Sequence, residues 1–270
     1  MSDTKDNNSI LETPISRRTF IKGAGIGLGA VAGAMVLTGA SDSVITDDPL
    51  PYKQLDPEEA FKRGHEGYHL GGCAYGSYYA IMSMLREKIG APYNNIPWRT
   101  LRFGGAGVAG WGTLCGVLTG TCAAIANVVP NADITKLTNE MLYWYSNTPI
   151  PTDEANTYAK KAKFTRTKKE YIKDVLPQSI SNSPLCHASV AKWCQEANID
   201  ENDPKRAERC GRATADAVKK CVELLNAYFA GTFKPSVASY ITTESQACLK
   251  CHTPDVGSLK MDCFSCHDGH

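Results

Sequence analysis

The hydrophobic pattern of this 270-residue chain predicts a helical protein. Apolar residues recur at the spacing of an amphipathic α-helix over residues 75–85, 111–129, 133–145 and 206–229. Asp56-Pro57-Glu58-Glu59 has the composition of a helix start, and Gly231 is expected to end the last helix. No alternating strand pairs stand out, and residues 231–270 show no period. We therefore expect a mainly α fold, a single helical domain followed by an irregular C-terminal tail.

The first forty residues have the composition of an export signal. Arg17 and Arg18 precede a weakly apolar run over 23–40 that is rich in glycine and alanine and ends in small residues. This arrangement predicts a twin-arginine signal and a mature chain in the bacterial periplasm. The alternative is an uncleaved membrane tether, which the six glycines of the run disfavour. The predicted divisions are residues 1–40 as signal peptide, 41–235 as a helical cysteine-rich domain and 236–270 as a haem-binding tail.

Charge excludes one class of partner. The chain carries 29 basic and 28 acidic residues, a formal net charge of +1, which argues against a nucleic-acid-binding protein. Residues 105–110 match Gly-x-Gly-x-x-Gly, but no apolar strand precedes them and no βαβ unit surrounds them. We therefore reject a dinucleotide site and expect these glycines to let the backbone approach a cluster or a helix closely.

Two pentapeptides in the tail, 248–252 and 263–267, have the sequence Cys-x-x-Cys-His, the attachment pattern of a c-type haem. The two thiols form thioethers to the haem, and the histidine becomes the proximal iron ligand. Disulfides or one zinc site are the alternatives, but neither needs a histidine after each pair. We predict two haem c groups, one on Cys248 and Cys251 with proximal His252, the other on Cys263 and Cys266 with proximal His267.

The two motifs are also close along the chain. The segment from His252 to Cys263 is too short to span more than about 40 Å even when fully extended. A folded segment would bring the irons much nearer, so we expect porphyrins in contact, with excitonically coupled Soret transitions.

Seven of the 11 cysteines remain for other roles: Cys73, Cys115, Cys122, Cys186, Cys194, Cys210 and Cys221. Disulfides are the ordinary outcome in an oxidising compartment, but an odd number leaves one thiol over. Thiolates gathered from separate segments are typical ligands of an iron–sulfur cluster, and less commonly of zinc. Cys122 and Cys221 have helix-core neighbours and are expected to be buried free thiols.

The export signal supports a second cofactor. C-type haem is attached after export, so haem alone does not require a route that carries folded cargo. Twin-arginine export is typically used when a protein is folded or loaded in the cytoplasm first. A metal cluster held by the remaining cysteines would meet that requirement.

Three segments carry a family resemblance. Gly72-Cys73-Ala74-Tyr75-Gly76, the glycine-rich stretch into Gly112-Thr113-Leu114-Cys115-Gly116, and 185–190 with Trp193-Cys194 resemble the redox-associated proteins named for a Cys, GCAxxG, Cys, Cys pattern. The resemblance covers nearly the whole mature chain. For a member with two C-terminal haem motifs it implies a homodimer with closely grouped bis-histidine haems near the interface, ligation that crosses between subunits, and an additional iron–sulfur centre, for which we favour [2Fe–2S]. Its implied cluster ligands are Cys73, Cys115, Cys186 and Cys194, with Cys210 in reserve.

Distal haem ligands are harder to assign, because four histidines remain for two positions: His65, His69, His187 and His270. His65 and His69 are four apart and share a predicted helix face, so we favour this pair. His270 is expected to reach the neighbouring haem or a partner subunit, and the alternative role for His187 is at the site of the adjacent cluster cysteine. Met261 is an alternative axial ligand that would raise the potential.

These cofactors predict an electron carrier rather than an enzyme. Haem and cluster would pass single electrons between a periplasmic dehydrogenase or hydrogenase, not identified by the sequence, and a further acceptor. Two alternatives remain open: a multihaem or thiol-based oxidoreductase with its own small-molecule substrate, and a redox sensor with a labile cluster. We expect the protein to be attached to a membrane only if the signal peptide is not cleaved.

Overall fold

The structure is a computed structural model that describes residues 47–163, 171–256 and 260–265. The α-helices are α2 (Pro57–Gly71), α3 (Cys73–Ile89), α4 (Gly116–Val128), α5 (Asn131–Asn147), α6 (Asp153–Lys161), α7 (Cys186–Ala197), α8 (Pro204–Phe229) and α9 (Thr243–Val256). Short 3-10 helices lie at η1 (Tyr93–Asn95), η2 (Trp98–Gly104) and η3 (Cys263–Ser265). Within the described ranges, β-structure is limited to two isolated bridges, Leu114 with Leu185 and Ile150 with Ser179. The predicted mainly α fold is confirmed.

None of the helices in the described part of the chain is both long enough and apolar enough to cross a membrane. The predicted export signal over residues 1–40 lies outside the described residues.

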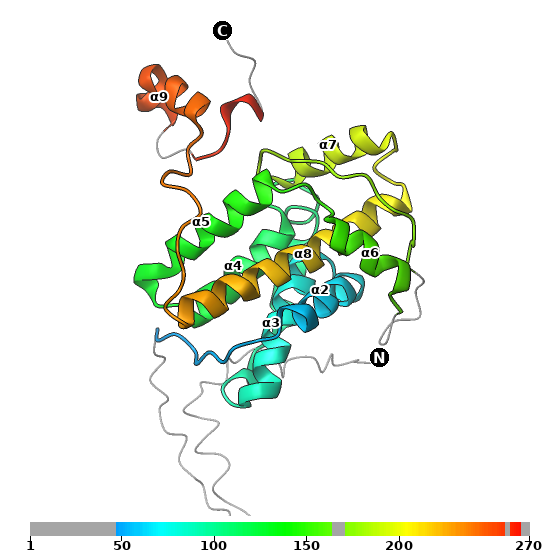
Figure 1. Ribbon diagram of the computed structural model, residues 1–270, viewed down its shortest axis with the longest axis vertical. Helices are drawn as coiled ribbons and strands as arrows, with labels where there is room; N and C mark the ends of the chain where they lie inside the picture. The colour runs from blue at the N-terminus through cyan, green and yellow to red at the C-terminus, as the bar shows by residue number, and fades with distance from the viewer. Residues whose placement is uncertain (1–46, 164–170, 257–259, 266–270) are drawn as a thin grey trace, which may run out of the picture. The chain divides into compact units, whose positions relative to one another are not determined.

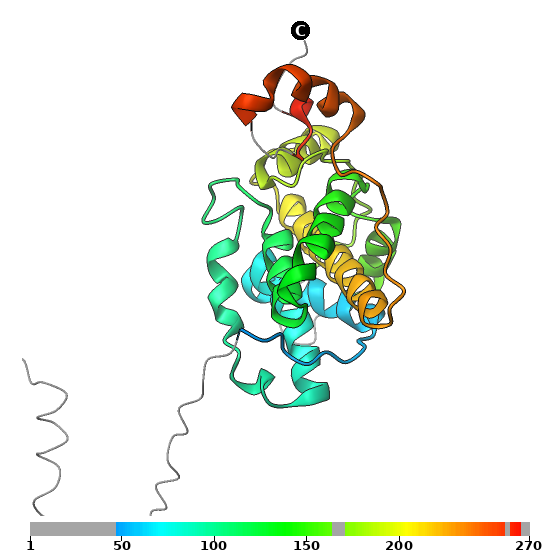
Figure 2. The ribbon, with the colours of Figure 1, turned by 90° about the vertical axis from the view of Figure 1, so that its left-hand side faces the viewer.

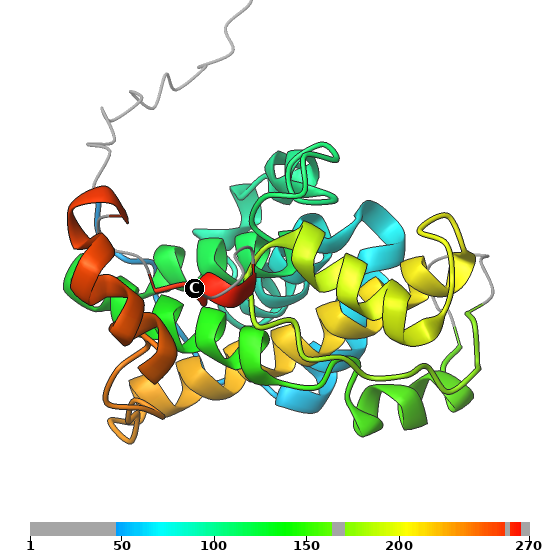
Figure 3. The same cartoon turned by 90° about the horizontal axis from the view of Figure 1, so that it is seen from above.

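Helix α8 is the centre of the helical body. It packs against α2, α3, α4, α5 and α6 (Figure 1). Figure 2 shows α5 beside α8, and Figure 3 shows α6 against the same helix from above. Its middle carries fully buried small residues, Ala213, Ala215 and Ala217, so neighbours pack on several of its faces. Gly64 of α2 makes the closest approach, since a Cβ there would lie 3.0 Å from the carbonyl oxygen of Thr214.

The start of α2 and its junction with α3 follow local chemistry. Asp56 caps α2 by accepting a hydrogen bond from the Glu58 backbone N–H at 2.9 Å, and Pro57 occupies the first turn. The chain reverses at Gly72, whose φ of +87° favours glycine. Gly76 then lets α3 cross α2, because a Cβ there would lie 2.4 Å from the Tyr68 backbone nitrogen. This reversal places Cys73 as the first residue of α3.

Three differences from the sequence prediction have physical causes. Helix α4 begins at Gly116 rather than at residue 111, because the preceding loop has positive φ at Ala106, Gly107, Val108, Ala109, Gly110 and Gly112. Helices α6 and α7 are short and were not predicted. The tail contains helix α9, which has little amphipathic period and therefore gives no hydrophobic signal.

Candidate metal centre and haem-attachment segment

A cavity of about 600 Å³ gathers five cysteines from segments far apart in the sequence. Its lining includes Cys73, Cys115, Cys186, Cys194 and Cys210. These are the four predicted cluster cysteines and their reserve, so the structure brings the whole candidate set together. Cys221 is buried and Cys122 half-buried, and neither lines this cavity.

Helix starts and one β-bridge hold three of these thiols in place. Cys73 is the first residue of α3, Cys186 is the first of α7, and Cys115 is the N-cap of α4. The bridge between Leu114 and Leu185 brings the second and third segments together. The Cys115 backbone N–H donates to Pro184 at 2.9 Å, and that of Cys186 donates to Thr113 at 2.7 Å. Helix N-termini favour negative charge, so these positions would stabilise the thiolates of a bound metal centre, although burial keeps the metal-free Cys73 and Cys115 thiols protonated.

Several of these thiols raise one another's pKa values. A hydrogen bond with Cys186, followed by burial, raises the pKa of Cys115 well above its usual value. Burial, followed by interaction with Cys115 and Cys210, raises the pKa of Cys73 to about 12. Burial also raises the pKa of Cys194, which interacts with Cys210. Without a metal, these three thiols are neutral at pH 7, and metal loading must displace their protons.

A buried polar chain leads from α8 to the Cys115 sulfur. Arg209 donates through Nη2 to the Ser189 hydroxyl at 2.7 Å. Ser189 and Tyr145 share a hydrogen bond of 2.8 Å, and the Tyr145 hydroxyl donates to Cys115 Sγ at 3.1 Å. All three polar residues are buried. The Arg209 Nε atom also lies buried without a hydrogen-bond partner among the described residues.

Two glycines leave space beside these cysteines, and Gly107 is the one member of the glycine-rich stretch 105–110 with such a close neighbour. A Cβ on Gly116 would lie 2.4 Å from Cys73 Sγ, and one on Gly107 would lie 2.8 Å from Cys186 Cβ. Side chains at these positions would therefore displace the thiols.

An anionic iron–sulfur cluster fits this cavity. The donor set is thiolate, three thiols lie at helix N-termini, and a buried guanidinium presents an unpartnered N–H where an acceptor is needed. A zinc ion would satisfy thiols but would not supply an acceptor for that N–H.

The first haem motif lies on helix α9. Cys248 is half-buried there, and Cys251 and His252 are exposed, so the motif's groups are accessible for covalent attachment. Partial desolvation raises the pKa of the Cys248 thiol, and the adjacent Cys263 thiol raises it further through a hydrogen bond. One attachment sulfur of each motif therefore lies beside one of the other. Cys266, His267 and His270 lie outside the described residues.

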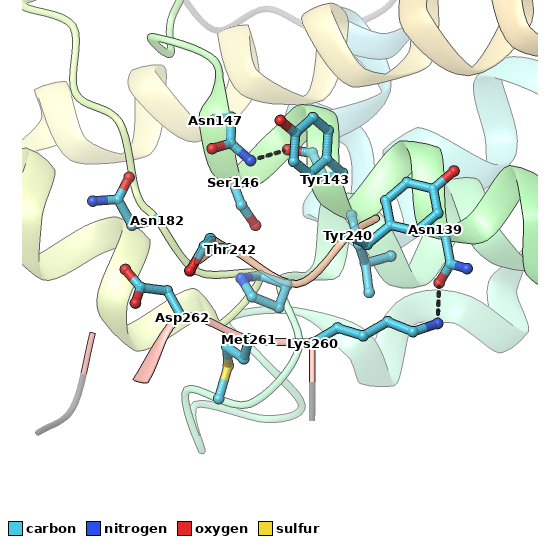
Figure 4. Close-up of a pocket in the computed structure, with 12 residues that line it drawn as sticks. Asn139, Tyr143, Ser146, Asn147, Asn182, Tyr240, Thr242, Lys260, Met261 and Asp262 are labelled. Atoms are coloured by element: carbon cyan, nitrogen blue, oxygen red, sulfur yellow. Dashed lines mark hydrogen bonds between the residues drawn. The ribbon is translucent and has the colours of Figure 1, made fainter. Parts of the chain in front are cut away.

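A groove of about 370 Å³ lies between α5 and the segment before the second haem motif (Figure 4). Lys260 donates to the Asn139 side chain at 2.9 Å, and Ser183 donates to the Met261 sulfur at 3.6 Å. Farther back along the tail, the Glu140 carboxylate accepts hydrogen bonds from the Ser236 backbone and the Tyr240 hydroxyl. These contacts anchor the tail to α5 on both sides of α9.

Two of the candidate distal histidines, His65 and His69, lie where α2 packs against α8. His65 is fully buried and His69 is 13% exposed, and both imidazoles face the buried Glu208 carboxylate of α8. To bind a haem iron, each would have to leave this enclosed contact, and their distal role stays a prediction. His187 is exposed at the start of α7 and lines the cysteine cavity.

Comparisons with known proteins identify relatives of this chain. Residues 75–224 match a family described as redox-active proteins with the C_GCAxxG_C_C pattern. The chain is 34% identical to split-Soret cytochrome c from Desulfovibrio desulfuricans over 94% of its own length and 95% of that protein. A solved structure of the split-Soret cytochrome c from the same organism, described as containing a novel iron centre, has 33% identity and a TM-score of 0.70, covering 82% of this chain and 91% of that one. The chain therefore belongs to the C_GCAxxG_C_C redox-active family, in the branch of split-Soret cytochrome c.

Proposed function

We propose that this chain is an electron-transfer protein that carries two haem c groups and a [2Fe–2S] centre. The observation that carries the proposal is the convergence of five thiols on one cavity beside a buried, partly unpartnered guanidinium. The similar protein from Desulfovibrio desulfuricans is a cytochrome c, and its structure is described as containing a novel iron centre. Both descriptions support haem and additional iron in this chain.

We assign the cluster ligands to Cys73, Cys115, Cys186 and Cys210. The first three lie at helix starts, and Cys73 interacts electrostatically with Cys115 and Cys210. Cys194 interacts electrostatically with Cys210, so we place it beside the cluster rather than on it. This assignment therefore includes Cys210, the reserve candidate of the sequence analysis, in place of Cys194, which was one of its four favoured ligands.

A cluster bound here would supply one-electron chemistry. The chain's own residues would orient the thiolates through helix starts and exclude water by burying Cys73 and Cys115. Arg209 would compensate negative charge, and Tyr145 would donate a hydrogen bond to one ligand sulfur. Charge-compensating groups and hydrogen bonds to sulfur are among the features that set cluster potentials.

The haem-bearing tail supports close porphyrins, because the Cys248 and Cys263 thiols are in contact. Bis-histidine ligation would then draw its distal ligands from His187 and His270, in the same chain or from a second copy in a homodimer. His65 and His69 are excluded from this proposal by their burial against Glu208. Six-coordinate irons leave no position for substrate, which favours a carrier over an enzyme.

Location and partners follow from the N-terminal motif. The paired arginines and the apolar run support twin-arginine export and a periplasmic mature chain. Its electron donor and acceptor would be other periplasmic redox proteins.

A reductive titration tests the proposal. Anaerobically purified protein should take up about three electrons per chain, two at haem and one at the cluster. The Cys115→Ser variant should take up about two, with the haem spectrum unchanged. Two electrons in both proteins would refute the cluster. Carbon monoxide binding to a native haem would refute six-coordination and favour the enzyme alternative.

A further inference from the structure

A second group of potential ligands lies where α2 crosses α8. On α2, residues 65–69 have the sequence His-Glu-Gly-Tyr-His, which matches His-Glu-x-x-His. On a helix, this spacing places two imidazoles on one face, the arrangement that binds zinc in metalloenzymes. A match this short indicates a metal site only if the fold supplies a third ligand.

The fold supplies that ligand from α8. His65 Nε2 lies 2.9 Å from one oxygen of Glu208, and His69 Nε2 lies 3.3 Å from the other. The three ligand atoms lie within 4.8 Å of one another. Ligands bound tetrahedrally at about 2.1 Å from zinc are separated by roughly 3.4 Å, so the two nitrogen–oxygen distances would have to lengthen only slightly to admit the ion.

Surrounding residues hold these ligands in position. Arg212 donates through Nε to Glu208 at 2.9 Å, and its other nitrogens donate to the Asn156 side chain and the Asp174 carbonyl. The Tyr171 ring packs 4.3 Å from the His65 ring, centroid to centroid. Hydrogen bonds to a ligating carboxylate and packing around its imidazoles are typical of built metal sites.

The His65 environment favours a neutral imidazole. Its Nδ1 atom is buried without a hydrogen-bond partner in the described part of the chain, and burial lowers the pKa of His65. A neutral imidazole can bind a metal, and binding at Nε2 would move the proton that Nε2 donates to Glu208 onto Nδ1.

We propose that His65 Nε2, His69 Nε2 and the Glu208 carboxylate bind a divalent transition-metal cation of the Zn²⁺ type. Two imidazoles and a glutamate are an established zinc donor set, with water in the fourth position. Glu208 would share its negative charge between the cation and Arg212, whose other nitrogens donate to the Asn156 side chain and the Asp174 backbone carbonyl. The site would join α2 to α8, adjacent to Tyr68 and Cys210 of the cysteine cavity.

The enclosure of the ligands indicates what the metal does. His65 and Glu208 are 0% and 2% exposed, so a substrate would not reach the metal as it does in a hydrolase. The site is therefore structural, and it holds no sulfur ligand. It stands independently of the proposed cluster.

Zinc binding to the holoprotein tests this inference. The protein would be equilibrated with about one equivalent of Zn²⁺ and desalted, then analysed for zinc, haem and acid-labile sulfide. Zinc K-edge absorption spectroscopy distinguishes zinc bound by His65, His69 and Glu208 from zinc bound by the cysteines. Zn–N and Zn–O bonds are near 2.0–2.2 Å, whereas Zn–S bonds are near 2.3 Å. We expect about one zinc per chain with only nitrogen and oxygen ligands.

His69→Gln is the primary variant, because His69 is partly exposed and the substitution leaves the Glu208–Arg212 contact in place. It should weaken zinc binding at least ten-fold with haem and sulfide unchanged. Lys62→Gln, at an exposed position on the same helix, is the matched control and should retain zinc. The inference is overturned if the wild type binds no zinc, if the zinc has sulfur ligands, or if His69→Gln binds it equally well. Absent sulfide would contradict the cluster proposal and leave this test unaffected.

Discussion

The hydrogen bond from Tyr145 to Cys115 should raise the reduction potential of the cluster. The Tyr145 hydroxyl donates to Cys115 Sγ at 3.1 Å, and both residues are buried. Reduction adds negative charge to the ligand sulfurs, so this donor stabilises the reduced state more than the oxidised one. Tyr145→Phe removes the donor and leaves the ring in place.

The size of the effect follows from the energy of one such bond. A buried hydrogen bond contributes about 1 kcal/mol. If that energy is present mainly in the reduced state, the potential should fall by about 40 mV, because about 1.4 kcal/mol corresponds to 59 mV for one electron. Ser189 keeps its bond from Arg209, so the rest of the polar chain is expected to survive.

The assay is a potentiometric titration of the cluster, with sulfide measured on the same samples. Tyr143→Phe is the control, since Tyr143 lies two residues earlier on α5 and lines the groove beside the tail instead of the cysteine cavity. An unchanged or higher potential in Tyr145→Phe, with full sulfide content, would refute the reasoning.

Three further predictions concern ligation, packing and pH. Cys210→Ser should lose acid-labile sulfide and Cys194→Ser should keep it; the reverse result would favour the ligand set implied by the family resemblance. Gly116→Ala places a methyl group 2.4 Å from the Cys73 thiol, so the variant should lose sulfide and be destabilised by about 1–3 kcal/mol in thermal unfolding. The control Gly105→Ala, whose methyl group would have its nearest atom 3.9 Å away, should show neither effect. Burial raises the pKa of Asp216 to about 6, so its stability contribution is present below the unfolded pKa and lost as pH rises through 6. Asp216→Asn should therefore reduce the loss of stability between pH 4 and 7.5 by about 2 kcal/mol; an identical pH profile would contradict this.

Local patterns predicted much of the fold. The capping residues at 56–59 and the amphipathic periods over 133–145 and 206–229 correspond to α2, α5 and α8. The error at α4 has a local cause, because the loop before it combines apolar residues with positive φ at Val108 and Ala109. Hydrophobic period alone does not distinguish such a loop from a helix start.

The sequence predicted which residues belong to the candidate sites better than it predicted which of them are neighbours. Spacing identifies the haem motifs, and the family resemblance identifies the cysteines, but which of the thiols interact depends on the fold. His65 and His69 lie on one helix face, as their spacing predicts, yet their neighbour is Glu208, which is 139 positions beyond His69 in sequence. The signal that sequence reasoning missed was the glutamate after His65, which completes His-Glu-x-x-His.

The most direct test of the central claim is the ratio of iron and acid-labile sulfide to covalent haem in protein purified without oxygen. The account predicts about four irons per chain, two in haem and two accompanied by about two sulfides. Two irons per chain, all in haem and without sulfide, would contradict it and leave the cysteine cavity without a cluster.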